Sequence, residues 1–447
     1  MERTRLMRTA AVVAVLSLGL TACPDGEEAD REGLAPGPGT PTPTEEVEVT
    51  GRGDGQLTMG RVLPESGFLD YLGVSMIHAT QMAIDDINEA GGVLGRDVRL
   101  LEEDSGTDPT VAGPNVNSLL ASGSDVIVGA AASGVTLSFL DVLFQNQIVN
   151  CSPSATSSEF LTQPNAAFMF RTVAPDDAVA PVIADEIVTR DGHSSVVIVN
   201  RSDSYGQNLA DLVAEELQAL NAEVLATVEY TEEEQTFDTQ VNTVTQNDPD
   251  AVVLIAFREG ATFLRRLAET DFDMSAVYGA DGVFSGRLPE FAAGEGGDVS
   301  ILDGMKVIGA SGSQEFNERL NESLPAEAKR EFIYGGQAYD CVTILALAAE
   351  QAQTDDSSQF ADLIVDLTRG GEKCTDFASC KQLLDDGQDI DYDGASGEIE
   401  LSQPPGEGNL GNPTVTTYAV ARYEGGELTL VRSERVDLET GATPTPQ

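Results

Sequence analysis

Few residues in this sequence have the types and spacing that an active site requires. It contains only two histidines, His78 and His193, which are far apart, and no cysteine stands at metal-ligand spacing near either one. Histidine-based acid–base catalysis and a histidine–cysteine metal site are therefore not expected. The sequence also has no Gly-x-Ser-x-Gly nucleophile motif and no phosphate-binding loop. We therefore predict a protein that is not an enzyme and that uses no metal and no cofactor.

Three polar residues stand instead at positions where a ligand could be bound. Ser133 follows the apolar run 126–130 and opens a helical segment, and Thr156 begins the helix-capping sequence 156–159. Helix N-termini carry free N–H groups and a positive dipole end, so both positions could hold an anion. Asp281 follows a further strand-like run and can face a crevice at the strand ends. Each residue has an ordinary alternative role, because Ser133 and Thr156 could cap their own helices and Asp281 could stabilise its own turn.

The segments that would position these residues alternate between strands and helices from residue 56 to about 436. Apolar runs at 57–63, 126–128 and 251–255 indicate buried strands, each followed by a helix-length segment. This α/β alternation predicts parallel sheets buried on both faces, with ligands at the carboxyl ends of the strands. The glycine pair within 424–427 predicts a hairpin turn near the C-terminus.

The charge balance excludes one class of partner. The chain has 447 residues with 75 Asp and Glu against 25 Lys and Arg, which gives a formal net charge of −50. Nucleic-acid binding takes clusters of lysine and arginine that neutralise phosphates, so no nucleic-acid partner is expected. The length allows two or three domains. The acidity predicts adaptation to a saline or alkaline habitat, and an acidic surface with no special adaptation is the alternative.

Residues 1–23 are typical of an export signal. Arginines precede the apolar run 10–20, and small residues then lead to Cys23. This run is too short for a membrane-spanning helix, which takes about 20 apolar residues. Its end resembles a bacterial lipobox, which implies lipidation of Cys23 and anchoring at the outer face of the cell membrane. Composition indicates a disordered acidic, Pro-rich tether over 24–55 and a disordered tail over 437–447.

Several short motifs occur in the order that is found in one protein family. They are Ser66-Gly67, Leu72-Gly73, the run 83–92 that ends in Gly91-Gly92, Ser152-Pro153-Ser154-Ala155-Thr156, Tyr205-Gly206, Gly279-Ala280-Asp281-Gly282 and Ala338-Tyr339-Asp340. With them the chain resembles, over about residues 57–423, the type I periplasmic binding proteins of branched-chain amino-acid ABC importers, the leucine/isoleucine/valine-binding family. The resemblance is more specific for the family than for the ligand.

The resemblance implies a fold of two doubly wound parallel-sheet lobes joined by three hinge crossovers, which close on a ligand. Lobe 1 would comprise residues 56–173 and 310–392. Lobe 2 would comprise residues 174–309 and 393–436.

The resemblance also implies how an α-amino acid would be held between the lobes. Both charged groups of such a ligand must be paired once they leave water. The matching positions assign the carboxylate and part of the ammonium to Ser133 and to the turn Ser154-Ala155-Thr156, and they assign the ammonium also to Asp281. Leucine-type members carry the longer Glu where this chain has Asp281.

The ligand side chain would meet a mainly apolar wall. The positions that match the family's pocket are Leu72, Tyr205, Phe257 and Tyr334. Leu72 and Phe257 are apolar where family members often carry a polar-tipped aromatic, and an apolar pocket suits an aliphatic ligand. Single aromatic residues are more often ordinary core residues, however, so these positions alone do not identify the solute.

Four cysteines remain besides Cys23, and an even number in an exported chain predicts disulfides, with three possible connectivities. Cys374 and Cys380 enclose a short loop that is easily closed. Cys151 ends a strand of lobe 1 and Cys341 begins a helix of lobe 1 beside the hinge, so we expect these two to form the second pair. Two buried free thiols are the alternative for Cys151 and Cys341.

The resemblance implies an exported, lipid-anchored monomer that captures a branched-chain or other aliphatic amino acid and delivers it to an ABC importer permease. One alternative is a binding protein for urea, short amides or another small polar solute, because such proteins share this fold. A second alternative is a ligand-sensing receptor subunit. That role would need a separate membrane partner, since no apolar run of about 18 residues follows the body of the chain.

Overall fold

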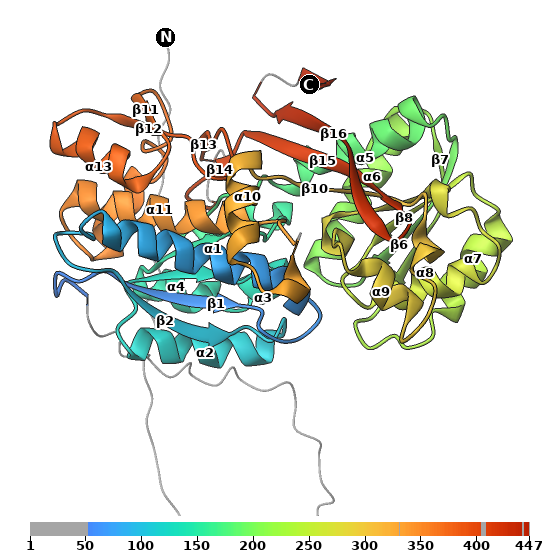
Figure 1. The fold of residues 1–447 in the computed structure, drawn as a ribbon, viewed down its shortest axis with the longest axis horizontal. Helices are drawn as coiled ribbons and strands as arrows, with labels where there is room; N and C mark the ends of the chain where they lie inside the picture. Colours follow the sequence, from blue (N-terminus) through green and yellow to red (C-terminus); the bar gives the residue numbers. More distant parts are fainter. Residues whose placement is uncertain (1–51, 330, 404–407, 440–441, 447) are drawn as a thin grey trace, which may run out of the picture. The chain divides into compact units, whose positions relative to one another are not determined.

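Two sheets organise the computed structural model, which describes residues 52–329, 331–403, 408–439 and 442–446 (Figure 1). The predicted signal peptide, Cys23 and the tether up to residue 51 lie outside the described residues. Among the helices in the described ranges, none has both the length and the apolar composition of a membrane-spanning segment. The chain alternates between strands and helices, as the sequence predicts.

The first sheet has five parallel strands in the order β2-β1-β3-β4-β5. Its strands are β1 (Thr58–Leu63), β2 (Arg99–Asp104), β3 (Val126–Gly129), β4 (Val149–Ser152) and β5 (Met169–Arg171). All residues of these strands except those of β2 are buried. Figure 1 shows α1 (Asp70–Glu89) and α11 (Gly335–Ala352) on one side of this sheet and α2 (Pro109–Ala121) on the other, as expected for a parallel sheet covered on both faces.

The second sheet has eight strands in the order β17-β16-β15-β10-β9-β8-β6-β7. Its strands are β6 (Ser195–Arg201), β7 (Glu223–Tyr230), β8 (Ala251–Ile255), β9 (Val277–Gly279), β10 (Lys306–Ala310), β15 (Val415–Glu424), β16 (Glu427–Asp437) and β17 (Ala442–Pro446). The strands from β6 to β10 run parallel, and the antiparallel hairpin of β15 and β16 extends the sheet beyond β10. Gly425 and Gly426 form its turn with φ values of 61° and 78°, which confirms the predicted hairpin.

The remaining helices and two small sheets connect these layers. The helices are α3 (Ser133–Leu137), α4 (Leu140–Asn146), α5 (Asp176–Ala184), α6 (Ser204–Ala219), α7 (Asp238–Asn247), α8 (Gly260–Ala268), α9 (Leu288–Ala293), α10 (Gln314–Ser323), α12 (Ser357–Phe360) and α13 (Phe377–Asp385). The small sheets pair β11 (Glu372–Cys374) with β12 (Ile390–Tyr392) and β13 (Leu401–Ser402) with β14 (Asn412–Pro413).

The chain passes between the two sheets three times, after β5, after β10 and between β14 and β15. Each sheet with its helices forms one lobe, so the predicted two-lobe α/β fold with three crossovers is confirmed. The last crossover differs from the predicted boundary at residue 393. Residues 394–403 and 408–413 stay with lobe 1, because Asp340 of α11 accepts hydrogen bonds from the backbone N–H groups of Ala395 and Ser396, at 2.7 and 2.8 Å, and β14 lies against β5.

The C-terminal segment also differs from its prediction. β16 continues to Asp437, and β17 pairs with it antiparallel within the region that the sequence indicated as a disordered tail. The extra strand supplies hydrogen bonds to the end of β16, which composition alone did not indicate.

Two disulfides join the same cysteines as the sequence prediction. Cys151 of β4 is bonded to Cys341 of α11, which ties the buried helix of lobe 1 to its sheet. Cys374 at the end of β11 is bonded to Cys380 in α13. The alternative of two free thiols at Cys151 and Cys341 is therefore not what the structure shows.

Candidate functional site

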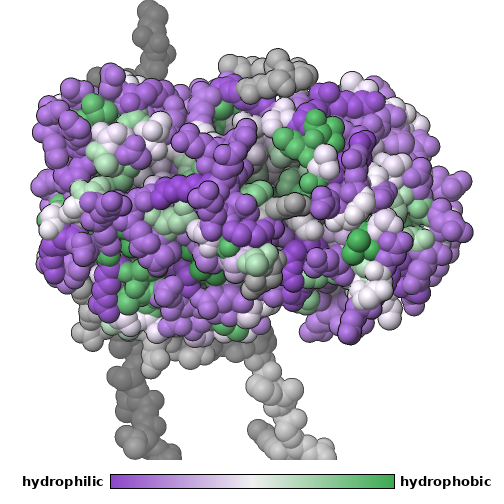
Figure 2. All heavy atoms as spheres, in the orientation of Figure 1, coloured by the Kyte–Doolittle hydropathy of each residue, from purple (hydrophilic) through white to green (hydrophobic). Residues whose placement is uncertain are grey.

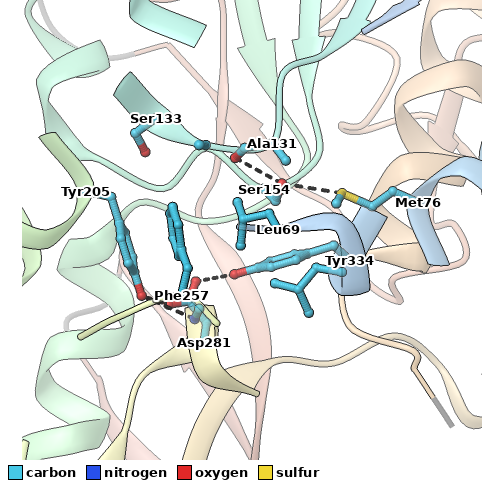
Figure 3. A pocket seen from close by; sticks show the side chains of 12 residues that line it. Leu69, Met76, Ala131, Ser133, Ser154, Tyr205, Phe257, Asp281 and Tyr334 are labelled. Carbon is cyan, nitrogen blue, oxygen red and sulfur yellow. Dashed lines mark hydrogen bonds between the residues drawn. The ribbon is translucent and has the colours of Figure 1, made fainter. Parts of the chain in front are cut away.

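A small cavity of about 20 Å³ lies where loops and helix ends of the two lobes meet (Figure 3). Its walls combine apolar side chains with a few polar groups, which is typical of a small-molecule site. The residues that line it are Leu69, Leu72, Met76, Ala131, Ala132, Ser133, Ser154, Tyr205, Phe257, Asp281, Gly282 and Tyr334. The structure thus brings together every residue that the sequence assigned to the ligand except Ala155 and Thr156. Those two are buried next to Ser154 in the same turn.

Asp281 lies at the centre of the polar groups. It follows β9 in a short 3-10 helix, Asp281–Val283, and is only 5% exposed. The phenols of Tyr205 and Tyr334 both donate hydrogen bonds to its carboxylate, as Figure 3 shows. Burial raises the pKa of Asp281, and the two phenol hydrogen bonds act against that rise. The carboxylate is therefore held in place by both lobes, and it does not serve merely to form its own turn.

A second buried carboxylate, Asp176, was missed by the sequence analysis. It is the first residue of α5 and is 1% exposed, and neither of its carboxylate oxygens has a hydrogen-bond partner among the described residues. Burial raises its pKa well above the ordinary value, and the charge of nearby Asp281 raises it further. Its place gave no signal, because an acidic residue in the first turn of a helix is usually explained by the helix dipole.

The turn of residues 154–157 is held from behind by a buried arginine. Arg171 of β5 donates hydrogen bonds from Nη1 to the carbonyl oxygens of Ala155 and Ser157, at 2.9 and 2.8 Å. The backbone N–H of Asp176 donates to the carbonyl oxygen of Thr156 at 2.9 Å. These three bonds fix successive carbonyl groups of the turn, so its remaining polar groups are left for other partners.

Neither candidate anion-binding hydroxyl caps its own helix. α3 begins at Ser133 without a side-chain cap, and Ser157, not Thr156, caps the 3-10 helix Ser158–Leu161. The predicted capping role of Thr156 is therefore wrong by one residue. Ser133 Oγ accepts a hydrogen bond from the Ser157 N–H at 3.2 Å, which leaves its own hydroxyl hydrogen able to donate. The Thr156 hydroxyl is buried without a hydrogen-bond partner in the part of the chain that the structure describes.

The rest of the cavity is apolar and aromatic. The Phe257 ring stacks on the Tyr205 ring, with centroids 5.4 Å apart and planes inclined by 16°. Leu72 and Met76 of α1 contribute aliphatic side chains from lobe 1. No group of histidine, cysteine and acidic residues within the described ranges has the arrangement of a metal site. The geometry suits a ligand with a charged polar end and an apolar end.

The two lobes touch each other around the cavity. Tyr71 of lobe 1 donates a hydrogen bond to the carbonyl oxygen of Gly282 in lobe 2. At the mouth, Arg258 of lobe 2 forms an ion pair with Asp70 of lobe 1, with Nη1 at 2.6 and 2.7 Å from the two carboxylate oxygens. These contacts, together with that between Tyr334 and Asp281, close the lobes over the site.

Comparison with known proteins places the chain among solute-binding proteins. The model of the family described as periplasmic binding protein matches residues 56–425. The chain is 27% identical over 358 residues to the chemotactic signal transduction system substrate-binding protein BasB of Halobacterium salinarum, which covers 77% of this chain and 83% of that protein. It is 25% identical over 305 residues to the Leu/Ile/Val-binding protein BraC3 of Rhizobium johnstonii, which covers 68% of this chain and 81% of that protein.

Solved structures share the fold. The branched-chain amino acid transporter substrate-binding protein LivJ of Streptococcus pneumoniae, in complex with isoleucine, has a TM-score of 0.69 at 18% identity, and the match covers 86% of this chain and 99% of that chain. The leucine-binding protein LivK of Thermotoga maritima gives the same values. A solute-binding protein of R. palustris in complex with benzoate has a TM-score of 0.65 at 17% identity, over 88% of this chain and 98% of that chain. These matches confirm the two-lobe fold.

Proposed function

Because the chain belongs to the periplasmic binding protein family, we propose that it binds an α-amino acid in the cavity between its two lobes. The matched relatives and structures are substrate-binding proteins and not enzymes, so the chain is a solute-binding protein. The identity of the solute is the part that we propose from the site.

The observation that carries this proposal is the pair of buried carboxylates, Asp176 and Asp281. Two like charges that are removed from water raise each other's pKa, and a cation between or beside them relieves that cost. The Thr156 hydroxyl and the charge of Arg171 favour the charged form of Asp176, but they do not offset the cost of burying it. A ligand ammonium group brings one positive charge and three donors, which matches what the two carboxylates lack.

The opposite charge of an amino acid would face hydroxyl and N–H donors of lobe 1. The Ser133 hydroxyl and the buried hydroxyl of Thr156 are available to a carboxylate, and both lie beside the start of a helix. Ser154, like Ser133, lines the cavity. A neutral amide or urea could use these donors, but it would bring no positive charge to the two carboxylates.

The apolar wall favours an aliphatic side chain. Leu72, Met76 and Phe257 line the cavity and offer no charged partner to a polar side chain. We therefore propose a branched-chain or similar aliphatic amino acid as the ligand. Relatives named Leu/Ile/Val-binding protein and leucine-specific-binding protein support this choice.

We further propose that the protein is exported, that it is anchored outside the cell membrane by a lipid on Cys23, and that it delivers its ligand as a monomer to an ABC importer permease. The basic and apolar sequence before Cys23 supports export and anchoring. Solved structures described as ABC transporter substrate-binding proteins support the importer as partner.

A ligand-sensing subunit is a second candidate for the role of the bound solute. It is favoured by the likeness to BasB, which is named as part of a chemotactic signal transduction system. The same cavity would serve both roles, so only the partner differs. Uptake of a radiolabelled ligand by cells with and without the gene would separate them, because a sensing subunit leaves uptake unchanged.

Calorimetric titration of the full chain tests the ligand assignment. The panel contains leucine, isoleucine, valine, glutamate, acetamide and urea. We expect tight binding of at least one aliphatic amino acid and no heat with the two amides.

Asp281→Asn removes the charge that meets the ammonium and should weaken binding by about 2 kcal/mol or more, roughly thirtyfold.

The matched control changes an exposed carboxylate that lies away from the cavity, as in Glu322→Gln. Its affinity should equal that of the parent. Tight binding of acetamide or urea without a response to amino acids would refute the proposal. An Asp281→Asn variant that binds leucine as well as the parent does would refute it too.

A further inference from the structure

Behind the aromatic wall of the cavity lies a buried ion cluster built on Arg201. This residue ends β6 and is 1% exposed. Its guanidinium pairs with three carboxylates, from Nε to Asp203 at 2.7 Å, from Nη2 to Glu232 at 2.8 Å and from Nη1 to Glu259 at 2.7 Å. Three partners on three nitrogen atoms fix both the position and the plane of the guanidinium.

The guanidinium lies directly over a ring of the cavity wall. Its central carbon is 3.6 Å from the centroid of Phe257, well within the distance of a cation–π contact. Glu259 also accepts a hydrogen bond from the backbone N–H of Phe257, at 3.1 Å. The ion cluster therefore holds both the ring and the backbone of this residue.

Contacts continue from Phe257 to the centre of the site. Its ring stacks on Tyr205, and the Tyr205 phenol donates to Asp281 (Figure 3). Arg201, Phe257, Tyr205 and Asp281 thus form one continuous series of contacts from the buried ion cluster to the carboxylate that we propose for the ligand ammonium.

The glycine that follows Tyr205 fits the same arrangement. A Cβ atom at Gly206 would overlap the carbonyl oxygen of Arg201 and lie 2.6 Å from its Cγ. A side chain at position 206 would therefore displace Arg201. Gly206 leaves room for Arg201, and the preceding residue, Tyr205, lines the cavity.

We infer that Arg201 is a positioning residue of the ligand site, which keeps the Phe257 and Tyr205 rings in the places that shape the cavity and orient Asp281. This role of Arg201 adds to the proposed function, and only the binding measurement below depends on that function. Arginine is needed because its flat guanidinium can stack on a ring while it pairs with carboxylates, whereas the lysine ammonium cannot do both. Arg201→Lys keeps the charge and loses the plane.

The position of the ring can be read without any ligand. The full chain is labelled with 4-fluorophenylalanine at position 257, and its fluorine NMR signal is recorded for the parent, Arg201→Lys and Glu232→Gln. We expect the signal to shift and broaden in Arg201→Lys because the ring is no longer held. Glu232 is the most exposed partner of Arg201, at 42% for its side chain, and a glutamine oxygen there can still accept the Arg201 hydrogen bond, so Glu232→Gln should leave the signal unchanged. An unchanged signal in a folded Arg201→Lys variant would overturn the inference.

Binding then tests whether the effect passes through Phe257. Arg201→Lys should weaken leucine binding about tenfold, as the loss of a buried cation–π contact suggests. In a Phe257→Leu background the same change should matter less than about threefold, because the ring that transmits it is gone. If Arg201→Lys lowers the leucine affinity equally in the parent and in the Phe257→Leu background, the inference is overturned. Arg201 would then have a general structural role, and Arg201→Lys would lower the melting temperature equally in both backgrounds.

Two further outcomes are distinguishable. If the parent binds no amino acid, the proposed function fails, and the fluorine signal alone decides on Arg201. If Arg201→Lys does not fold, the double variant Arg201→Lys/Glu232→Gln, which carries one carboxylate fewer around the lysine, replaces it in both measurements. A fluorine signal in the double variant that equals that of Glu232→Gln would overturn the inference.

Discussion

Asp281 is the residue on which the two lobes converge. Tyr205 of lobe 2 and Tyr334 of lobe 1 both donate hydrogen bonds to it, so the bond from Tyr334 can form only when the lobes are closed. Tyr334 has a φ of 63°, in the left-handed region that a tyrosine adopts at some cost.

Asp176 should show opposite effects on stability and on binding. Burial and the charge of Asp281 disfavour its charged form more than the Thr156 hydroxyl and Arg171 favour it, so Asp176→Asn should raise the melting temperature of the ligand-free protein. The same change removes a charge from the site and should weaken leucine binding by about 1–3 kcal/mol, or fivefold to a hundredfold. Thermal unfolding and calorimetry measure the two quantities.

The neighbouring carboxylate provides the control. Asp177 is exposed on the same helix, and Asp177→Asn should leave leucine affinity within about twofold of the parent. If Asp176→Asn lowers the melting temperature and binds leucine normally, Asp176 has a structural role and the two-carboxylate account is wrong.

At this scale the sequence predicted the residues whose motifs are distinctive. Ser133, Ser154, Tyr205 and Asp281 all follow strands, and the structure brings them to one cavity. The sequence could not predict the role of Asp176, because this role depends on burial that only the packing of the lobes creates. Arg171 and Arg201 were missed for the same reason, since charged residues are normally exposed.

An ion pair between Arg258 and Asp70, which we call the latch, joins the two lobes next to the cavity. Arg258 precedes α8 of lobe 2 and pairs with Asp70, the first residue of α1 in lobe 1. It also donates to the carbonyl oxygen of Gly67 at 3.1 Å. Both side chains of the ion pair are about one third exposed, so salt and water weaken their attraction.

Removal of the latch should speed ligand release. Arg258→Ala destabilises the closed arrangement by about 0.5–1 kcal/mol, so the dissociation rate of leucine should rise about threefold with little change in the association rate. Stopped-flow measurements determine both rates. Arg266→Ala, which removes an exposed ion-paired arginine of α8 away from the mouth, is the control. Equal dissociation rates in Arg258→Ala and parent would contradict the latch.

A second contact between the lobes depends on pH. Glu331, in the segment before α11 of lobe 1, accepts a hydrogen bond from Ser285 of lobe 2 at 2.9 Å and is 1% exposed. Burial raises its pKa from 4.5 to about 7, although the Ser285 hydrogen bond and the charge of Arg287 oppose the rise. The folded protein thus binds this proton more tightly than the unfolded chain, so its free energy of unfolding should fall as pH rises from about 4.5 to 7.

Glu331→Gln should remove this slope. The glutamine cannot ionise, so at pH 8 the variant should exceed the parent in free energy of unfolding by on the order of 2–3 kcal/mol, and by much less at pH 5. Denaturant titrations at the two pH values measure the difference. Glu322→Gln, at an exposed glutamate of α10, should leave the parent's slope in place. A parent-like slope in Glu331→Gln would contradict this account.

Sequence patterns predicted the elements well where chain-local signals exist. The parallel strands, the hairpin at Gly425 and Gly426, and both disulfides occur as expected. The return to lobe 2 was placed too early, because Asp340, a partner far away in the sequence, holds Ala395 and Ser396 in lobe 1, and β14 lies against β5. Strand β17 was missed since its pairing with β16, and not its composition, makes it a strand.

The molecule as a whole carries far more negative than positive charge. The face shown in Figure 2 is mostly hydrophilic. Among the described residues, few large apolar side chains are exposed, and the largest exposed fraction is that of Leu430, at 61%. Because the sequence has 75 acidic residues against 25 basic ones, exposed carboxylates can lie close to others of the same sign. Asp211 and Glu215 are an example, since both are exposed and lie one turn apart on α6.

Added salt should stabilise this protein strongly. With a net charge of −50, the folded state suffers self-repulsion that counter-ions screen over about 10 Å at 0.1 M and about 3 Å at 1 M ionic strength. We expect the melting temperature to rise with NaCl, most steeply below about 0.3 M, where screening changes most.

Glu215→Lys turns the repulsion with Asp211 into attraction, so it should stabilise the protein at low salt by about 0.5 kcal/mol and lose that advantage at 1 M. Glu215→Gln, which removes the repulsion alone, should fall between the two. A melting temperature that does not change between low salt and 1 M NaCl, or a Glu215→Lys effect that is independent of salt, would show that surface repulsion does not limit the stability of the folded chain.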